Sequence, residues 1–178
     1  MHRPNNVLLS TGMFLAGIIL LSGPVFAQQS KTFEHRQFKY TIKYPADYQL
    51  KPLGRVMVFV SPDVDKKNGF AENVNVAVEP LSAPVMKLDD FFTGAKKNLT
   101  LGGSGVKILE EKKDKLSGAE AYKIIYTSKQ KKTNFKLLQV ITIHKDKAFV
   151  VTYTALAEQF DRGLSQANSI IKSLKFTD

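Results

Sequence analysis

The sequence contains no cysteine among its 178 residues. This absence excludes disulfide bridges, thiolate metal sites and thiol nucleophiles. It also excludes the lipid-bearing cysteine by which bacterial lipoproteins are anchored. The folded part of the chain must therefore be held together by its apolar core, and a region the length of residues 28–178 can bury about 70% of its unfolded surface as one domain.

Histidine is almost as scarce. The chain has three histidines, and only His35 and His144 follow the first 27 residues. Histidine is the usual proton shuttle near neutral pH, and a triad or metal site needs further partners around it. We interpret both residues as exposed strand-end histidines and expect a protein that is not an enzyme.

The first 27 residues have the pattern of an export leader. His2 and Arg3 precede an apolar stretch centred on residues 13–21, Pro24 follows it, and Val25-Phe26-Ala27 offers small residues for a signal peptidase. This order is typical of a secretory signal peptide. An uncleaved membrane anchor is the alternative, but the apolar centre is short for a span of roughly 20 residues. We predict a signal peptide at 1–27 and one domain at 28–178.

Basic residues outnumber acidic ones, at 26 Lys and Arg against 16 Asp and Glu. Of all these, only Arg3 lies in the leader, so residues 28–178 carry a net charge of +9. Nine lysines fall between Lys107 and Lys136. An exported protein rarely meets nucleic acid, so we expect no nucleic-acid partner. The segment indicates either attraction to an anionic membrane surface or acidic partner, or a solvated face. The candidate partner-binding residues are Lys112, Lys113, Lys129, Lys131 and Lys132.

Period-two alternation predicts strands over most of residues 38–155. The expected strands are 38–44, 56–60, 73–79, 106–112, 119–127, 135–144 and 148–155. Pro45 and Ser61-Pro62 are expected to end the first two. The strand at 135–144 is apolar on both faces, which predicts a central position covered on both sides. Short connections after residue 106 predict antiparallel pairing.

Two helices are expected, one between the third and fourth strands and one at the end of the chain. Leu88, Phe91, Phe92, Ala95 and Leu99 form one apolar stripe, and Gly102-Gly103 should end that helix. A second stripe runs from Phe160 to Leu174. An antiparallel sheet with helices packed on its faces is an α+β arrangement.

The loop from Ser61 to Asn73 is a candidate calcium site. Asp63, Asp65 and Glu72 supply hard oxygen ligands of the kind calcium prefers, so these three are the candidate metal ligands. Lys66 and Lys67 would repel a cation, and the spacing is not that of an EF-hand. The alternative is an ordinary polar hairpin loop without any cofactor.

Six segments follow the leader in a distinctive order: Phe38–Tyr48 (FKYTIKYPADY), Asn73–Leu81 (NVNVAVEPL), Leu88–Phe92 (LDDFF), Leu116–Thr127 (LSGAEAYKIIYT), Leu137–Ala155 (LLQVITIHKDKAFVVTYTA) and Ser169–Phe176 (SIIKSLKF). Their succession resembles a PsbP-like domain, whose fold is shared with the nuclear-transport factor Mog1. The resemblance implies an α+β fold, an α/β/α sandwich with a central, mostly antiparallel sheet of about six to seven strands flanked by helices.

The resemblance also implies a function. Plant and cyanobacterial PsbP-like proteins are extrinsic subunits on the lumenal side of photosystem II, where they support calcium and chloride retention. The present chain lacks their longer amino-terminal extension and the cyanobacterial lipid-bearing cysteine. We therefore expect an exported, non-catalytic accessory protein, monomeric, that docks on a membrane-associated protein complex or an anionic membrane surface. Its expected place is the periplasm or another extracytoplasmic space, or the thylakoid lumen in a photosynthetic host. The alternative is an extracytoplasmic ligand- or calcium-binding protein.

Overall fold

The computed structural model describes residues 29–81, 86–101 and 105–177. The predicted leader and the predicted helix stop at Gly102-Gly103 lie outside these residues. The first part of the described chain consists of β1 (Ser30–His35), β2 (Tyr40–Pro45), β3 (Gln49–Leu53), β4 (Val56–Val64) and β5 (Ala71–Pro80). The rest consists of α1 (Leu88–Leu101), β6 (Lys107–Leu116), β7 (Ala119–Gln130), β8 (Thr133–His144), β9 (Lys147–Leu156), α2 (Phe160–Lys172) and β10 (Lys175–Phe176).

The strands form two antiparallel sheets. The larger sheet has seven strands in the order β3-β4-β5-β9-β8-β7-β6, and the smaller has three in the order β1-β2-β10. The predicted α+β fold with a mostly antiparallel central sheet is therefore confirmed. The pairing of β5 with β9 joins the first half of the chain to the second.

Strands β6 to β9 follow one another as tight hairpins, as the short connections predict. Each hairpin loop contains a residue with a positive φ angle: Ser117 at 52°, Lys131 at 54° and Lys145 at 55°. Two-residue hairpin turns need this left-handed backbone because it matches the twist of the strands. The strand that is apolar on both faces, β8, lies between β9 and β7 and is covered on both sides, which confirms its predicted central position.

The strand prediction missed the two-residue β10, and three further details of it are wrong. Strand β1 was not expected because its side chains are mostly exposed, and its pairing with β2 depends on the backbone rather than on an apolar pattern. Strand β3 was missed because it contains Pro52, which an edge strand accommodates. Strand β4 continues through Pro62 to Val64, where the register with β5 shifts and the proline can be tolerated.

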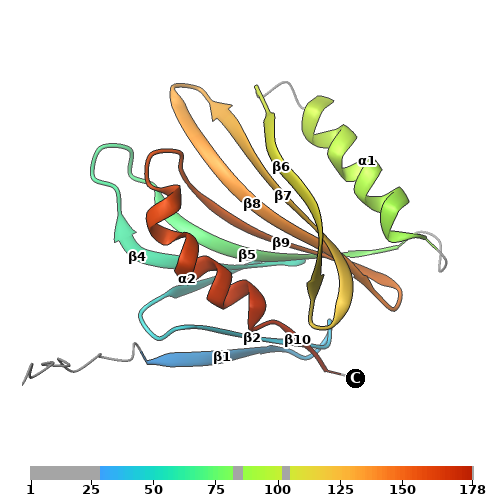
Figure 1. Cartoon of the computed structure of the whole chain (residues 1–178). Helices are drawn as coiled ribbons and strands as arrows, with labels where there is room; N and C mark the ends of the chain where they lie inside the picture. Colours follow the sequence, from blue (N-terminus) through green and yellow to red (C-terminus); the bar gives the residue numbers. More distant parts are fainter. Residues whose placement is uncertain (1–28, 82–85, 102–104, 178) are drawn as a thin grey trace, which may run out of the picture.

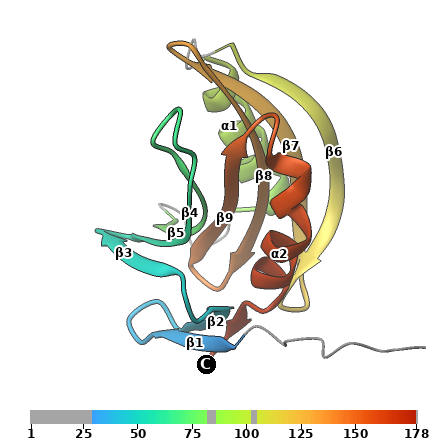
Figure 2. The same ribbon diagram turned by 90° about the vertical axis from the view of Figure 1, so that its left-hand side faces the viewer.

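The helices cover opposite faces of the large sheet. Helix α2 and the small sheet lie together on one face, and α1 lies on the other (Figure 1). Figure 2 shows the strong curvature of the large sheet and the small sheet below α2. Three layers of this kind form the α/β/α sandwich that the resemblance implies.

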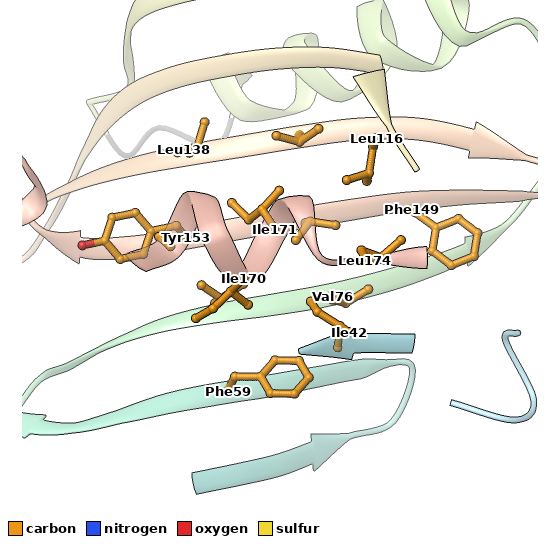
Figure 3. Close-up of a cluster of buried hydrophobic side chains, with 14 of the residues drawn as sticks. Ile42, Phe59, Val76, Leu116, Leu138, Phe149, Tyr153, Ile170, Ile171 and Leu174 are labelled. Carbon is orange, nitrogen blue, oxygen red and sulfur yellow. The ribbon is translucent and has the colours of Figure 1, made fainter. Parts of the chain in front are cut away.

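The main core lies under α2. Ile170 and Ile171 of α2 and Leu174 just after the helix meet side chains of the large sheet such as Val76 and Phe149, and Ile42 of β2 joins them from the small sheet (Figure 3). Phe59 of β4 is fully buried between the sheets, with its ring centroid 5.8 Å from Phe33 and 5.1 Å from Tyr44. A smaller core under α1 contains Phe92, whose ring stacks on Tyr122 at 4.1 Å.

A glycine sets the distance between α2 and the sheet. The Tyr153 hydroxyl of β9 donates its single proton to Glu72 Oε2 (2.7 Å), and the carbonyl oxygen of Phe160 lies 3.3 Å from the same hydroxyl. A Cβ atom on Gly163 would lie 2.3 Å from both the Tyr153 hydroxyl and Glu72 Oε2. Burial and the neighbouring carboxylate together raise the pKa of the Tyr153 hydroxyl, so it remains a donor. Only glycine at position 163 lets the helix backbone come this close.

His35 of β1 is half-buried rather than exposed, contrary to expectation. Its ring packs on Phe38 at 4.5 Å and on Tyr40 at 5.3 Å, and its Nδ1 accepts a hydrogen bond from the Phe38 amide. Desolvation lowers the pKa of His35 below 6.5. The unfolded chain therefore binds more protons than the folded protein just below pH 6.5.

We accordingly expect stability to fall modestly as the pH drops from about 8, through the unfolded-state pKa, toward about 5.5. Comparing urea midpoints at these two pH values for the wild type and His35→Gln checks this. The variant should lose part of the pH dependence, while His144 remains present in both proteins. Identical pH profiles would contradict the assignment to His35.

Candidate functional site

The lysine-rich segment occupies β6, β7 and the start of β8, at one edge of the large sheet. Lys112 and Lys113 lie in the middle of β6, opposite Lys123 and Tyr122 of β7. Because neighbouring strand residues point to opposite faces, these two lysines project from different sides of the sheet. Lys129, Lys131 and Lys132 lie at the β7–β8 hairpin, about 20 Å along β7 from Lys123. The structure thus divides the predicted partner-binding residues into two groups.

The carboxylate of Glu110 on β6 faces two lysines of the sheet, one on β6 and one on β7. Lys112 Nζ lies 2.7 Å from Glu110 Oε1, and Lys123 Nζ lies 4.0 Å from the same oxygen. The hydrogen bond from Lys112 lowers the pKa of Glu110 and raises that of Lys112. Alternating charges on an exposed edge strand hinder pairing with other chains, so this group fits a protective role for the edge.

The hairpin lysines differ in this respect. Within residues 29–81, 86–101 and 105–177, neither Lys129 nor Lys131 nor Lys132 has an ion pair, and all three are exposed. Exposed charges without a compensating partner nearby produce the strongest local field. This hairpin is therefore the better candidate for an electrostatic contact.

The fold brings two further lysines to the same end of the molecule. Lys67 of the β4–β5 connection and Lys132 line one polar cavity of about 320 Å³, together with Thr133, Asn134 and Glu158. Figure 1 shows the β4–β5, β7–β8 and β9–α2 connections at one end of the molecule. We call the surface formed by Lys66, Lys67, Lys129, Lys131 and Lys132 the basic end.

Side-chain contacts hold the connections of the basic end together. Gln159, just before α2, donates a hydrogen bond from Nε2 to Asp65 Oδ2 (2.8 Å). The Phe70 and Phe135 rings contact each other edge to face at 4.9 Å. The amide of Ala157 donates to the carbonyl of Asn134 (2.9 Å). These contacts join segments that are far apart in sequence, so the charges are held in a defined arrangement.

The contribution of Lys66 and Lys67 was missed by sequence reasoning. These lysines lie more than 60 positions before Lys131, and only the strand order β4-β5-β9-β8 brings the two connections together. No local pattern in the sequence carries that information. From the sequence, Lys66 and Lys67 were interpreted only as charges that would repel calcium, and not as part of a candidate binding surface.

The three candidate metal ligands are engaged separately. Asp65 Oδ1 accepts hydrogen bonds from the amides of Lys67 (3.1 Å) and Asn68 (2.8 Å) and from the Asn68 side chain (3.0 Å). These bonds lower the pKa of Asp65. Glu72 accepts a hydrogen bond from the Tyr153 hydroxyl, and Asp63 lies in the exposed last part of β4. In the described part of the chain, no three carboxylate or imidazole groups are arranged to hold a metal ion.

We expect millimolar calcium to leave the melting temperature unchanged, because the Asp65 carboxylate is already fully used in organising its loop. Thermal melts with calcium, with magnesium and with a chelator check this. A rise that is specific for calcium and absent from Asp65→Asn would instead establish the calcium site that the sequence suggested.

His144 also packs on an aromatic ring. It lies on Phe176 of β10 with parallel planes and a centroid distance of 4.0 Å. Both histidines of the described chain thus contact aromatic side chains that hold the small sheet. Neither of the helices in the described residues combines the length and apolar character needed to cross a bilayer.

Comparison with known proteins adds a family and a fold. The family model of PsbP matches residues 28–176. The solution structure of cyanobacterial PsbP (CyanoP) from Synechocystis sp. PCC 6803 superposes with a TM-score of 0.59 at 14% identity, covering 90% of this chain and 99% of CyanoP. LpqN, described as involved in cell envelope biogenesis of Mycobacterium tuberculosis, gives 0.61 at 16% identity, covering 84% of this chain and 91% of LpqN.

A third structure is larger than this chain. A protein from Bacteroides thetaiotaomicron superposes with a TM-score of 0.60 at 17% identity over 84% of this chain, which spans only 49% of that protein. At these identities the structural likeness shows the shared fold alone. No curated protein matches the sequence.

Proposed function

Since this chain belongs to the PsbP family, we propose that it is an exported, non-catalytic accessory protein that docks on a membrane-associated protein complex through its basic end. PsbP-like proteins are generally non-catalytic, and their fold here presents a rigid sheet with charged connections. The observation that supports docking is the convergence of exposed lysines from two separate connections at one end of the sheet, none of which has an ion pair within the described residues.

The charge balance supports an anionic partner. Residues 28–178 carry a net charge of +9, and two carboxylates of β6 already face lysines of the same protein, Glu110 with Lys112 and Lys123 and Glu111 with Lys96 of α1. Each lysine near an anionic surface contributes about 1 kcal/mol to binding. Five lysines at one end therefore suffice for reversible association. The contact weakens with salt because exposed charges are screened over about 8 Å at physiological ionic strength.

The predicted leader supports the location outside the cytoplasm that this proposal requires. The residues at 1–27 have the composition of a signal peptide, and LpqN, which shares the fold, is described as involved in cell envelope biogenesis. We place the present protein in the periplasm or an equivalent extracytoplasmic space. The photosystem complex of cyanobacterial PsbP is one example of the kind of partner.

Charge reversal at the basic end tests the proposal. The triple variant Lys67→Glu, Lys131→Glu and Lys132→Glu should reduce recovery of the partner from envelope extracts by about tenfold or more at low salt. A control with the same change in net charge is Lys51→Glu, Lys87→Glu and Lys175→Glu, which lie away from the basic end and should bind as the wild type does.

The measurement is pull-down from detergent-solubilised envelope extract at low and high salt, with sedimentation of anionic lipid vesicles in parallel. Capture of one protein complex that depends on the basic end supports the proposal. Equal loss of binding in both triple variants would contradict the proposal, because it would show that binding depends on the net charge of the protein and not on the basic end. Binding to the vesicles without capture of a protein complex would identify the lipid surface as the target instead.

A further inference from the structure

The face of the large sheet that carries α1 is only partly covered. Helix α1 lies chiefly over β7 and β8; Val150 of β9 joins the core cluster under it, whereas no residue of β5 is part of that cluster in the described chain. A cavity of about 490 Å³ lies beside α1, between Asp90 and Asn98 of the helix and Glu79, Gln139 and Val150 of the sheet. A second cavity of about 320 Å³ shares Asn98 and Leu99 with it and continues to Phe135 and Thr154. We call this continuous depression the α1 groove.

A glycine in the wall of the groove has no structural explanation in the free protein. Gly94 lies in the interior of α1 and lines the larger cavity, yet a Cβ atom built on it would meet nothing within 4 Å. Glycine inside a helix costs about 1 kcal/mol relative to alanine. This contrasts with Gly163 of α2, where neighbouring atoms exclude any side chain. The absent side chain at position 94 leaves the helix backbone open to close approach by another chain.

The charges of the groove oppose those of the protein as a whole. Glu79 and Asp90 lie at one end of the larger cavity, and no lysine or arginine is among the described residues that line either cavity. In a domain with a net charge of +9, such a groove disfavours anionic ligands and favours a cationic group at the Glu79–Asp90 end.

The remaining lining suits an extended peptide. Leu99, Val150 and Phe91 offer apolar contact surface, and Asn98 and Gln139 carry amide groups that can both donate and accept hydrogen bonds. Gln139 Nε2 is held by the Thr152 hydroxyl at 3.0 Å, which fixes the orientation of its amide. From Asp90 to Asn98 the groove follows α1 for about 12 Å, the length of roughly four residues of extended chain.

We propose that the α1 groove binds an extended peptide segment of a partner protein, in which a basic residue lies next to apolar residues. The basic residue lies at Glu79 and Asp90, and the peptide backbone passes over Gly94. The groove adjoins the basic end at Phe135, but its peptide-binding part between Glu79 and Asn98 does not depend on electrostatic docking at the basic end.

The test uses the protein of residues 28–178 and a random peptide library displayed on phage. Selected peptides should be rich in lysine or arginine next to apolar residues and poor in aspartate and glutamate. Binding of a selected, fluorescently labelled peptide should weaken by about tenfold or more in Gly94→Phe, because the ring fills the groove. Thr93→Phe, which places the same ring on the adjacent exposed position, should leave the affinity unchanged.

A library that yields no specific peptide overturns the proposal. So does a peptide that binds Gly94→Phe as tightly as the wild type, since it must then lie elsewhere. A glycan array provides a separate outcome, because a neutral oligosaccharide that binds the wild type but not Gly94→Phe would make the groove a sugar site. Circular dichroism and thermal melts of both phenylalanine variants confirm that a loss of binding is not a loss of folding.

Discussion

Replacing Gly163 by alanine is expected to lower the free energy of unfolding by about 2 kcal/mol, within the range for overpacking a close contact. The new methyl group would lie 2.3 Å from Glu72 Oε2 and from the Tyr153 hydroxyl. Either α2 must move away from the sheet, or the hydrogen bond between Tyr153 and Glu72 must break. Both responses disturb the main core, because Ile170 and Ile171 belong to the same helix.

Urea unfolding followed by circular dichroism measures this change, and the chain provides a matched control. Gly94→Ala makes the same substitution inside the other helix, where the methyl group meets open space. It should raise the free energy of unfolding by up to about 1 kcal/mol, because alanine is the better helix former. Shifts of the same sign and size in the two variants would contradict the close approach at Gly163.

The substitution Phe59→Ala is expected to have a larger effect, a loss of about 3 to 4 kcal/mol. Phe59 is fully buried and its ring contacts Phe33 of β1 and Tyr44 of β2. It therefore forms a principal contact between the large sheet and the small sheet. The cavity left by the ring should weaken the attachment of the small sheet more than the pairing within the large one.

Hydrogen exchange distinguishes these two effects. In Phe59→Ala we expect the amides of β1 and β2 to lose protection first, while those of β7 and β8 keep most of theirs. Leu53→Ala is the control, because Leu53 of β3 is 64% exposed and should change stability by no more than about 0.5 kcal/mol. Uniform loss of protection over both sheets would show that the small sheet is not an independent unit.

The second half of the fold was more predictable than the first, for a physical reason. Strands β6 to β9 pair with their neighbours in sequence, so alternation and turn residues contain most of the information about them. The double-sided apolar pattern of β8 even indicated its inner position. In contrast, β1 is held mainly through its backbone and lies at an edge, and β10 has two residues only, so neither has an apolar pattern to detect.

The basic end was predicted in part. The hairpin lysines stand out because they follow one another at residues 129–132, but the sequence does not separate them from Lys112 and Lys113, which have Glu110 and Tyr122 beside them in the fold. Strand register decides whether a lysine has a carboxylate beside it, and the positions of lysines in the sequence do not reveal strand register. Lys67 joins the site through strand order alone.

The way the strands pair also bears on when the protein can fold. β5 obtains its second neighbour from β9, and β2 obtains one from β10, the last strand of the chain. The segments that emerge first from a ribosome or a membrane channel therefore remain incomplete until β9 and β10 have followed, and non-local pairing of this kind is slow. For a chain that crosses a membrane unfolded, as we propose, this delay keeps the polypeptide competent for translocation until β9 and β10 have passed.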